Sequence, residues 1–335
     1  MSNKVLVTGG AGYIGSHTVR ELRKKAIEVV VLDDLRHGHR SSIPDIPLFQ
    51  TDLSDEKKVA EIFAQEGPFE AVIHFASFIE AGRSVHDPLV FYQNNVSNSI
   101  SLLKRMVEGG TKNFILSSSA AVYGEPCYVP IDEEHPIAPL NPYGISKSMV
   151  ETILKSCEVY GIRYCSLRYF NAAGADPTGD IGEDHSPETH LIPLVLKVAM
   201  ARKSGGSPSP VKVFGTDYPT PDGTCIRDYI HVCDLANAHV LAIQYLKAER
   251  KSCCFNVGNG NGYSVKEVVK TAQEVSQVDI PWTAQERRAG DPAVLVASSE
   301  KIRKELGWEP RYPRLETIVE HAWKWHGSHP EGYGE

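Results

Sequence analysis

A tyrosine and a lysine four positions apart, Tyr143 and Lys147, are the residues of this sequence best suited to acid–base chemistry. Asn141 is suited to cap a helix that starts at Pro142, and the spacing then places both side chains on one face of that helix. A free phenol has a pKa of about 10, but a nearby ammonium stabilises the phenolate and would lower this value. The pair therefore predicts a tyrosine that acts as the general base for an alcohol.

A run of three serines upstream strengthens this interpretation. Ser117 and Ser119 bound the run, which ends an apolar segment typical of a strand. A hydroxyl at the end of a strand can reach the same substrate oxygen as the phenol. Without these serines, two unrelated surface side chains would explain the tyrosine and lysine about as well.

A glycine-rich segment near the N-terminus has the pattern of a phosphate-binding turn. Gly9, Gly12 and Gly15 lie between the apolar run Lys4–Thr8 and a helix-like segment. Glycines there allow a tight turn and a close approach of the backbone to a diphosphate, whose charge the N-terminus of the helix favours. The spacing differs from the commonest dinucleotide fingerprint, and a turn that binds nothing is the alternative.

An acidic residue after the second apolar run indicates which dinucleotide would bind. Asp33 ends that run, where a carboxylate accepts hydrogen bonds from an adenosine ribose and repels a 2′-phosphate. The sequence therefore favours NAD over NADP. Arg36 and Arg40 are near enough to leave the second possibility open.

The order of elements predicts a scaffold that brings these residues together. Apolar runs typical of strands alternate with helix-like segments through the first half of the chain, which predicts an α/β fold with a doubly wound, Rossmann-like parallel sheet. Strands are expected at Lys4–Thr8, Glu28–Asp33, Leu48–Gln50, Ala71–Ala76, Asn113–Ser117 and Tyr164–Arg168, and helices at Tyr13–Lys25, Glu56–Gln65, Pro88–Glu108 and Pro142–Tyr160.

The second half of the chain predicts a smaller, mixed α/β lobe. Residues 172–188 and 205–210 are expected to be loops, and the tail after His326 to fray. We expect a Rossmann domain over residues 1–171, with parts of 225–250 packing on it, and a substrate lobe formed mainly by residues 172–335. Helices are expected at Leu191–Arg202, Val232–Leu246, Val265–Val275, Ser299–Leu306 and Arg314–Trp325, and strands near Val211–Phe214 and Cys254–Val257.

Composition excludes several classes of protein. The chain has 335 residues, 41% of them hydrophobic, so it can bury a sizeable core. Its net charge of −7 disfavours nucleic acid and anionic membranes as partners. The seven cysteines include no Cys-x-x-Cys, and neither a signal peptide nor a run of about 18 apolar residues is present, so a cytoplasmic enzyme is expected. The 13 histidines include no His-Glu-x-x-His, and no metal site is expected.

The glycine turn, the strand-end serines and the Tyr-x-x-x-Lys pair together resemble the extended short-chain dehydrogenase/reductase family. Within it, the chain is similar over essentially its whole length to the UDP-glucose (UDP-galactose) 4-epimerases. Related sugar dehydratases carry an Asp-Glu pair where this chain has Ala120 and Ala121, which disfavours elimination. The resemblance rests on segments 8–17, 72–77, 94–96, 117–124, 141–147, 167–175, 179–185, 190–193, 213–232 and 287–292.

This resemblance implies a site for each component of the reaction. Tyr143, Lys147 and Ser119 would be catalytic. NAD would contact Gly9, Gly12, Tyr13, Ile14, Gly15, Asp33, Asp34, Leu35, Arg36, His37, Gly38, Asp52, Leu53, Phe75, Ala76, Ser77, Ile79, Asn95, Ser117, Tyr143, Lys147 and Phe170. The UDP-hexose would contact Ser119, Tyr143, Asn171, His190, Leu191, Lys212, Val213, Phe214, Arg227, Arg288, Asp291 and Leu295.

The implied reaction is NAD-dependent inversion of carbon 4 of a UDP-hexose through a transient 4-keto sugar. The alternatives are another NAD-dependent enzyme acting on nucleotide sugars, such as a decarboxylase or reductase, and a non-catalytic dinucleotide sensor. Relatives form homodimers through the helices that correspond here to Pro88–Glu108 and Pro142–Tyr160, and a homodimer is expected.

Three positions depart from the family's usual pattern. His190 replaces an asparagine that contacts substrate, and Ile79 replaces a lysine near the NAD diphosphate. Leu295 replaces a tyrosine found in members restricted to glucose and galactose. A residue smaller than tyrosine at position 295 predicts that UDP-GlcNAc and UDP-GalNAc are also handled.

Overall fold

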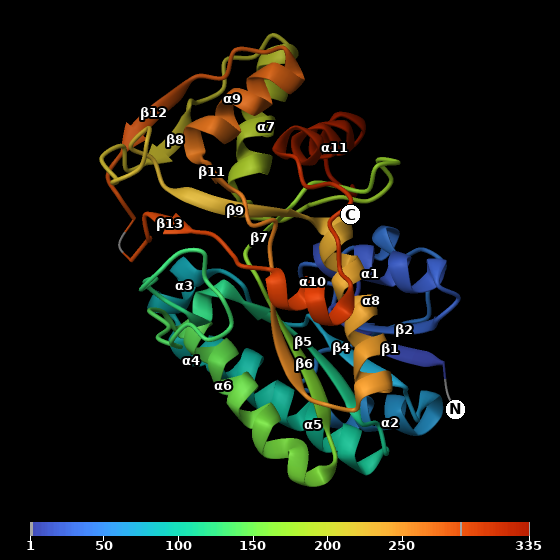
Figure 1. The fold of residues 1–335 in the computed structure, drawn as a ribbon. Coiled ribbons are helices and arrows are strands. Elements are labelled where there is room, and N and C mark those ends of the chain that lie inside the picture. Colours follow the sequence, from blue (N-terminus) through green and yellow to red (C-terminus); the bar gives the residue numbers. More distant parts are fainter. Residues whose placement is uncertain (1–2, 289, 335) are drawn as a thin grey trace.

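A seven-stranded parallel sheet forms the larger lobe of the structure, a computed structural model that describes residues 3–288 and 290–334 (Figure 1). The order of its strands is β3-β2-β1-β4-β5-β6-β10, so the chain winds outward in both directions from β1 and β4. This arrangement confirms the predicted doubly wound α/β fold. The strands are β1 (Lys4–Thr8), β2 (Glu28–Asp33), β3 (Leu48–Gln50), β4 (Ala71–His74), β5 (Asn113–Ser119), β6 (Arg163–Tyr169) and β10 (Cys253–Val257).

Helices cover both faces of this sheet, which is why its strands are apolar almost throughout. Side chains alternate between the faces: Val5 and Val7 join the core under one set of helices, and Leu6 joins the core under the other. The first set is α1 (Tyr13–Lys24), α8 (Val232–Glu249) and α10 (Glu300–Leu306). The second set is α2 (Glu56–Glu66), α5 (Asn98–Glu108) and α6 (Pro142–Ser156).

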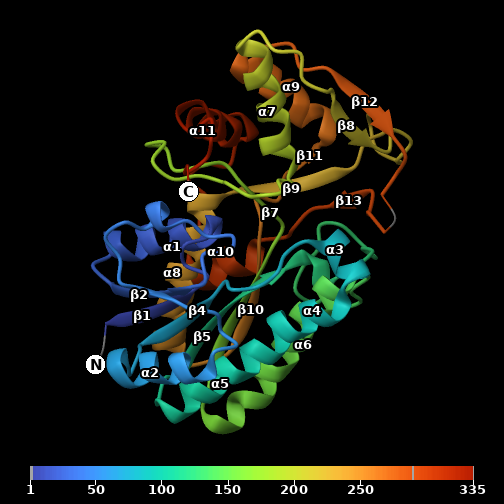
Figure 2. The same ribbon diagram turned by 180° about the vertical axis from the view of Figure 1, so that it is seen from behind.

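The smaller lobe packs three helices around a core of its own, beyond the carboxyl ends of the large sheet (Figure 2). The helices are α7 (Leu191–Lys203), α9 (Val265–Ser276) and α11 (Leu315–Ser328). Two small sheets accompany them. One pairs β8 (Val211–Phe214) with β12 (Trp282–Gln285), and the other places β9 (Ile226–His231) among β7 (Asn171–Ala173), β11 (Gly262–Ser264) and β13 (Val294–Leu295).

The chain returns to the large sheet after entering the smaller lobe. Helix α8 fulfils the expectation that parts of residues 225–250 pack on the first lobe, but β10 and α10 belong there as well. Strand β10 pairs with β6 along its full length, for example Phe255 with Leu167. The expected division at residue 171 therefore stays a prediction, and it needs this amendment because β10 and α10 lie beyond residue 250.

Several short elements were not predicted, and β9 shows why. Its residues Arg227, Asp228 and His231 are buried although they are polar, so the strand lacks an apolar pattern. The others are β7, β11, β12, β13, α3 (Ala81–His86) and the short turns η1 (Arg40–Ser42), η3 (Ala120–Val122) and η4 (Cys157–Tyr160).

The predicted helix Pro88–Glu108 contains an irregularity. It begins as α4 (Pro88–Tyr92), continues as a π-helical turn, η2 (Gln93–Ser97), and resumes as α5. A π-turn inserts one residue into the helical register and often marks a functional site. Here it carries Asn95.

The expectation that the tail frays is wrong. Helix α11 runs to Ser328, and the following residues fold back on the molecule. The ring of Tyr333 stacks on His39 at 4.7 Å, and its backbone N–H donates to Asp184. Aromatic contacts thus fix a segment whose small and polar composition suggested disorder. Within the described residues, no helix combines the length and the apolar character needed to span a bilayer.

Candidate active site

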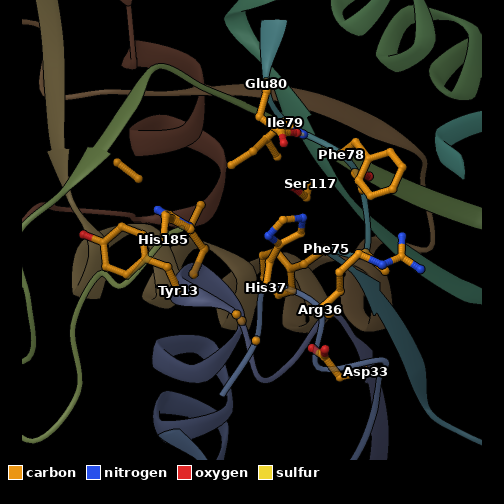
Figure 3. Close-up of a pocket in the computed structure, with 18 of the residues that line it drawn as sticks. Tyr13, Asp33, Arg36, His37, Phe75, Phe78, Ile79, Glu80, Ser117 and His185 are labelled. Carbon is orange, nitrogen blue, oxygen red and sulfur yellow. Dashed lines mark hydrogen bonds between the residues drawn. The ribbon is translucent and has the colours of Figure 1, made fainter. Parts of the chain in front are cut away.

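A cavity opens where the strand order reverses, at the carboxyl ends of β1 and β4. Such switch points are where open α/β sheets bind ligands, because the connecting segments diverge there. Figure 3 shows Tyr13, Asp33 and His37 on one side of the cavity, with Phe75 and Ser117 nearby. The segment 183–190 closes the cavity from the smaller lobe.

The glycine turn fits tightly against the next strand. A Cβ atom on Gly9, whose φ is +72°, would lie 2.6 Å from the backbone nitrogen of Ala76. A Cβ on Gly15 would lie 2.1 Å from the carbonyl oxygen of Gly9. A Cβ on Gly12, the residue that precedes α1, would meet only one atom within 4 Å and would otherwise face the cavity. The turn therefore offers open backbone at the N-terminus of a helix, which suits a diphosphate.

Asp33 holds this turn in place. Its two carboxylate oxygens accept hydrogen bonds of 2.9 Å each from the backbone N–H groups of Ala11 and Leu35. Burial raises the pKa of the Asp33 carboxyl, and these two hydrogen bonds act in the opposite direction. Each oxygen keeps a lone pair for a ribose hydroxyl, since a carboxylate has about four acceptor positions.

The two arginines that left NADP open are already engaged. The guanidinium of Arg36 lies 3.2 Å from Asp34 and 3.1 Å from Asp52. Arg40 donates to the carbonyl oxygens of Pro44 and Ile46. Two carboxylates beside Arg36 repel a 2′-phosphate, and the structure therefore fits NAD better than NADP.

The helix that carries Tyr143 begins as predicted. The side chain of Asn141 accepts a hydrogen bond of 2.9 Å from the backbone N–H of Gly144, and Pro142 occupies the first turn. A Cβ on Gly144 would lie 2.5 Å from the carbonyl oxygen of Ala121, so the helix approaches the end of β5 closely. This contact brings Tyr143 and Ser119 into the same cavity wall.

The lysine lies beneath the cavity and does not line it. Lys147 is 2% exposed, and its ammonium donates hydrogen bonds of 2.8 Å to the Ser77 hydroxyl and to the Ser117 carbonyl. Its nitrogen is 5.8 Å from the ring centre of Tyr143. It therefore joins the ends of β4 and β5 to α6 below the phenol.

The pKa of Tyr143 is shifted in the direction opposite to the one expected from the sequence. Burial raises the pKa of Tyr143, and a hydrogen bond with Ser119 only partly opposes it. Burial also lowers the pKa of Lys147 to about 7, against the influence of Glu151. Lys147 bonds to the Ser77 hydroxyl and to the Ser117 carbonyl, and burial is the larger influence on the pKa of Tyr143.

A buried network behind the cavity supports Lys147, and the sequence analysis did not find it. Glu151 lies one helical turn beyond Lys147 and accepts hydrogen bonds from Ser118 and from Arg168, with distances of 2.6 Å and 2.6–3.0 Å. Arg168 also donates to the hydroxyl of Tyr123 at 2.9 Å. The only signal in the sequence was the four-residue spacing between Lys147 and Glu151.

The π-turn fixes a second wall of the cavity. The Asn95 amide accepts a hydrogen bond from the N–H of Phe78 at 2.8 Å and donates to its carbonyl at 3.0 Å. It also donates to Ser146, three residues after Tyr143. Asn95 is buried and holds the wall segment against α6.

Most residues predicted to bind cofactor line this one cavity. Leu35, Asn95 and Lys147 do not, and Ile79 stands 43% exposed beside Glu80 at the rim (Figure 3). The predicted cofactor residues that line it are Gly9, Gly12, Tyr13, Ile14, Gly15, Asp33, Asp34, Arg36, His37, Gly38, Asp52, Leu53, Phe75, Ala76, Ser77, Ile79, Ser117, Tyr143 and Phe170.

The predicted substrate residues fall into two groups. Ser119, Tyr143, Asn171 and His190 line the main cavity. The others lie in or next to the smaller lobe, where Arg288 and Asp291 line a separate hollow. The guanidinium of Arg288 lies 4.2 Å from the ring centre of Phe214.

Arg227, Leu295 and Leu191 line neither hollow directly. Arg227 bonds to the Asp291 carboxylate, and to the Pro292 carbonyl at 2.7 Å. Leu295 pairs with Arg227 across β13 and β9 and packs near Phe170.

Strand β8 presents the remaining predicted residues. The side chain of Val213 is fully buried and that of Lys212 is exposed, as alternation along a strand requires. Val213 could therefore meet a ligand only through its backbone. Leu191, at the start of α7, packs in the same core cluster as Val213.

A cluster of histidines and glutamates in the segment 183–190 was not anticipated. Glu183, His185 and His190 line the main cavity, and Glu188 completes the cluster. Burial lowers the pKa of both histidines, but the two carboxylates outweigh it and raise the pKa of His185 to about 9 and of His190 to about 10. Other cavity residues that the sequence analysis missed include Thr51, Glu80 and Tyr169, whereas Phe78 lies within the segment Phe75–Ile79 that was expected to line the cofactor channel.

Comparisons with known proteins agree with this geometry. The model of the NAD dependent epimerase/dehydratase family matches residues 5–258. The UDP-glucose 4-epimerase of Halalkalibacterium halodurans is 52% identical over 330 residues, which cover 98% of this chain and 97% of that protein.

Solved structures match along the whole chain. The UDP-glucose 4-epimerase from Bifidobacterium longum in complex with NAD+ and UDP has a TM-score of 0.92 at 38% identity, covering 98% of this chain and 100% of that one. The UDP-Glc/GlcNAc 4-epimerase from Campylobacter jejuni has a TM-score of 0.83 at 43% identity, with coverage of 98% and 100%.

The buried lysine predicts a pH dependence of stability. The pKa of Lys147 is lower in the folded chain, about 7, than in the unfolded chain, about 10.4, so the unfolded chain binds more protons between these values. The contribution of Lys147 to stability therefore falls as pH decreases from about 10 to 7. We expect the unfolding free energy of the wild type, relative to Lys147→Met, to rise with pH in this window by at most about 1.4 kcal/mol per unit.

Urea unfolding without added nucleotide, at several pH values, measures this difference. Lys155→Met, at the other end of α6, serves as the matched control and should parallel the wild type. If the unfolding free energies of the wild type and of Lys147→Met changed with pH by the same amount between pH 7 and pH 10, this result would contradict the lowered pKa of Lys147.

Proposed function

The chain belongs to the NAD dependent epimerase/dehydratase family, and we propose that it inverts carbon 4 of a UDP-hexose with Tyr143 as the base. One observation carries this proposal. Tyr143 and Ser119 line the same cavity as the glycine turn, at the switch point of the sheet. A phenol, a hydroxyl and a dinucleotide cradle in one cavity are what the oxidation of a secondary alcohol requires.

The cavity residues fit NAD. Open backbone at Gly12 would bind the diphosphate, and Asp33 would bind the adenosine ribose. When bound, oxidised NAD would supply a hydride acceptor and the positive charge of its pyridinium ring. Ser77 and Lys147, which bond to each other below the cavity, would hold the ribose next to that ring.

The chain's own part in the chemistry is to move one proton. Tyr143 accepts the proton of the sugar's 4-hydroxyl as carbon 4 loses its hydride and becomes a carbonyl. Ser119 donates a hydrogen bond to the same oxygen and holds it in line. After the planar keto sugar turns over, hydride returns to the opposite face, and Tyr143 gives the proton back to the oxygen. No proton or electron is lost in a full cycle.

The smaller lobe would anchor the nucleotide while the sugar turns. Arg227 and Arg288 carry the positive charge that a diphosphate needs, and Phe214 offers an aromatic face near them. The contacts of Arg227 with Asp291 and of Arg288 with Phe214 hold the two guanidinium groups in position before the nucleotide binds. Tight binding of the nucleotide beside a loosely held sugar is what inversion demands.

Other reactions of this family are less compatible with the cavity. Elimination needs an acid beside the strand-end serine, and Ala120 and Ala121 provide none. A decarboxylase or reductase would convert its substrate in one net direction. Release of CO2 or net consumption of NADH would identify such an enzyme.

Replacement of the phenol tests the base. In Tyr143→Phe we expect turnover of UDP-galactose to fall by about 10²- to 10⁴-fold, because general acid–base catalysis contributes about that factor. Binding of NAD and UDP should persist, since the ring stays in place. Coupled assays of UDP-glucose formation and calorimetric titration with UDP measure the two effects. Tyr160→Phe, an exposed tyrosine beyond the same helix, is the control, and near-normal turnover in Tyr143→Phe would rule out the assignment.

We further propose that acetylated sugars are accepted. Leu295 packs with Phe170, Val122 and Tyr123 next to the catalytic end of the cavity. A leucine leaves more room there than a tyrosine. The dual specificity that names the Campylobacter jejuni relative, a UDP-Glc/GlcNAc 4-epimerase, supports the same proposal.

An enlarged side chain at position 295 tests the proposal. Leu295→Tyr should lower kcat/KM for UDP-GlcNAc at least about tenfold and change that for UDP-glucose by less than about threefold, because only the acetyl group would meet the added ring. Leu295→Met preserves the volume and is the control. Products resolved by NMR measure both reactions, and a wild type that converts neither acetylated sugar would exclude the proposal.

We also propose that the chain forms a homodimer through α4, α5 and α6, which lie side by side in both views (Figures 1 and 2). The support is a set of exposed apolar side chains on these helices: Leu89 is 77% exposed, Ile100 48% and Met149 43%. Unpaired apolar surface of this kind is typical of an interface.

Charge placed on this surface tests the dimer. The double variant Ile100→Arg and Met149→Arg should sediment as a monomer, since burying two guanidinium groups without partners is costly. Trp282→Arg, on β12 of the other lobe, should leave the wild-type mass unchanged. Equal sedimentation of the wild type and the double variant would count against this interface.

A further inference from the structure

Four side chains of one loop point to a common centre. Glu183, His185, Glu188 and His190 lie between β7 and α7, and one ligand atom from each lies within 4.8 Å of the others. His185 stands beside Tyr13 in the cavity wall (Figure 3). The proton transfer described above uses none of the four.

Distances within this histidine–glutamate cluster, from 2.9 to 3.6 Å, lie on both sides of the separation expected between neighbouring ligand atoms of a metal ion. His190 Nδ1 is 2.9 Å from Glu183 Oε1 and 2.9 Å from Glu188 Oε1. His185 Nδ1 is 3.2 Å from Glu183 Oε1 and 3.6 Å from Glu188 Oε2. Neighbouring ligand atoms of a tetrahedral zinc ion, with bonds of about 2.0–2.2 Å, are about 3.3–3.5 Å apart.

The orientation of His185 is a second, independent observation. Its Nδ1 atom is buried, yet within the described residues it meets no partner in hydrogen-bond geometry despite the two nearby carboxylates. A ring nitrogen that needed only an ion pair would be directed at one carboxylate oxygen. This nitrogen is close to two carboxylates and aligned with neither, as a ligand of an ion between them would be.

The glutamates are preorganised. The Glu188 Oε1 atom accepts hydrogen bonds of 2.7 Å from the backbone N–H groups of Thr189 and His190, which fixes the carboxylate and leaves Oε2 for another partner. The side chain of Glu183 is only 5% exposed. A buried carboxylate in contact with two imidazoles is expensive without a cation or two protonated rings.

We propose that Glu183, His185, Glu188 and His190 bind one divalent transition-metal ion, with zinc as the best match. Two imidazoles and two carboxylates suit zinc, whereas magnesium and calcium prefer oxygen ligands alone. Four protein ligands leave no open position, so the ion is structural. It fixes the loop that carries six cavity residues, three of them its own ligands, and holds His185 next to Tyr13, at the start of α1.

Metal content and affinity test the site directly. Full-length protein without an affinity tag, stripped with a chelator and dialysed, should take up one zinc ion per chain in calorimetric titration with Zn²⁺. Addition of Zn²⁺ should raise its melting temperature. Co²⁺ in the same protein should give the visible absorption of a tetrahedral ion.

Single variants locate the ligands. His185→Ala and Glu188→Gln should each weaken zinc binding at least about tenfold, since even residues that only support a ligand cost about 10–100-fold. His86→Ala, an exposed histidine at the end of α3, should bind like the wild type. If a variant does not fold, the titration of the wild type still decides the question.

Two results would overturn the proposal. The first is a stripped wild type that binds less than about one zinc ion in ten chains and keeps the same melting temperature with Zn²⁺. The cluster would then be a pair of imidazolium–carboxylate contacts. The second is equal zinc affinity in His185→Ala and in His86→Ala, which would place the ion elsewhere.

Discussion

The site depends on the close approach of the glycine turn, which follows β1, to the backbone that follows β4. Neither Gly9 nor Gly15 has room for a single additional carbon, because backbone atoms of Ala76 and of the turn itself occupy the space. This contact sets the direction of α1 and hence where its N-terminus faces. Other contacts of the site depend on the positions of the ends of β1 and β4. Examples are the hydrogen bond between Asp33 and the turn and the one between Lys147 and Ser77.

Burial has opposite effects on the two residues of the acid–base pair. A phenol removed from water holds its proton more tightly, and an ammonium removed from water holds it less tightly. The chain buries both groups. The effect of burial on the pKa of Tyr143 is only partly opposed by Ser119, and its effect on the pKa of Lys147 is only partly opposed by Glu151. Positive charge near Tyr143 would favour its proton-accepting form, and the pyridinium ring of bound NAD would supply such charge.

The sequence predicted the elements with clear periodicity and missed those defined by tertiary contact. The parallel sheet and its helices could be predicted from apolar runs such as those around Leu6 and Phe114, because neighbouring residues in the sequence suffice to indicate that these segments are buried. Strand β9 could not be predicted, because Arg227 and Asp228 are buried by partners distant in the chain. The same holds for the tail, where Tyr333 is ordered by His39, and for the cavity residues Glu183 and His185. Motifs identified the catalytic pair, but its pKa values depend on desolvation that spacing does not show.

The late arrival of β10 has a consequence for how the molecule is made. During synthesis, β6 remains the edge of the sheet until residue 257 has left the ribosome, with Leu167 and Cys165 lacking the neighbour that will cover them. By then β7, α7, β8 and β9 of the smaller lobe have been made, whereas its helices α9 and α11 follow β10, so the nascent chain carries an open edge strand while the first part of that lobe emerges. Truncation anywhere before this point leaves the larger sheet without its last strand, so the first lobe cannot be completed before part of the second has been made.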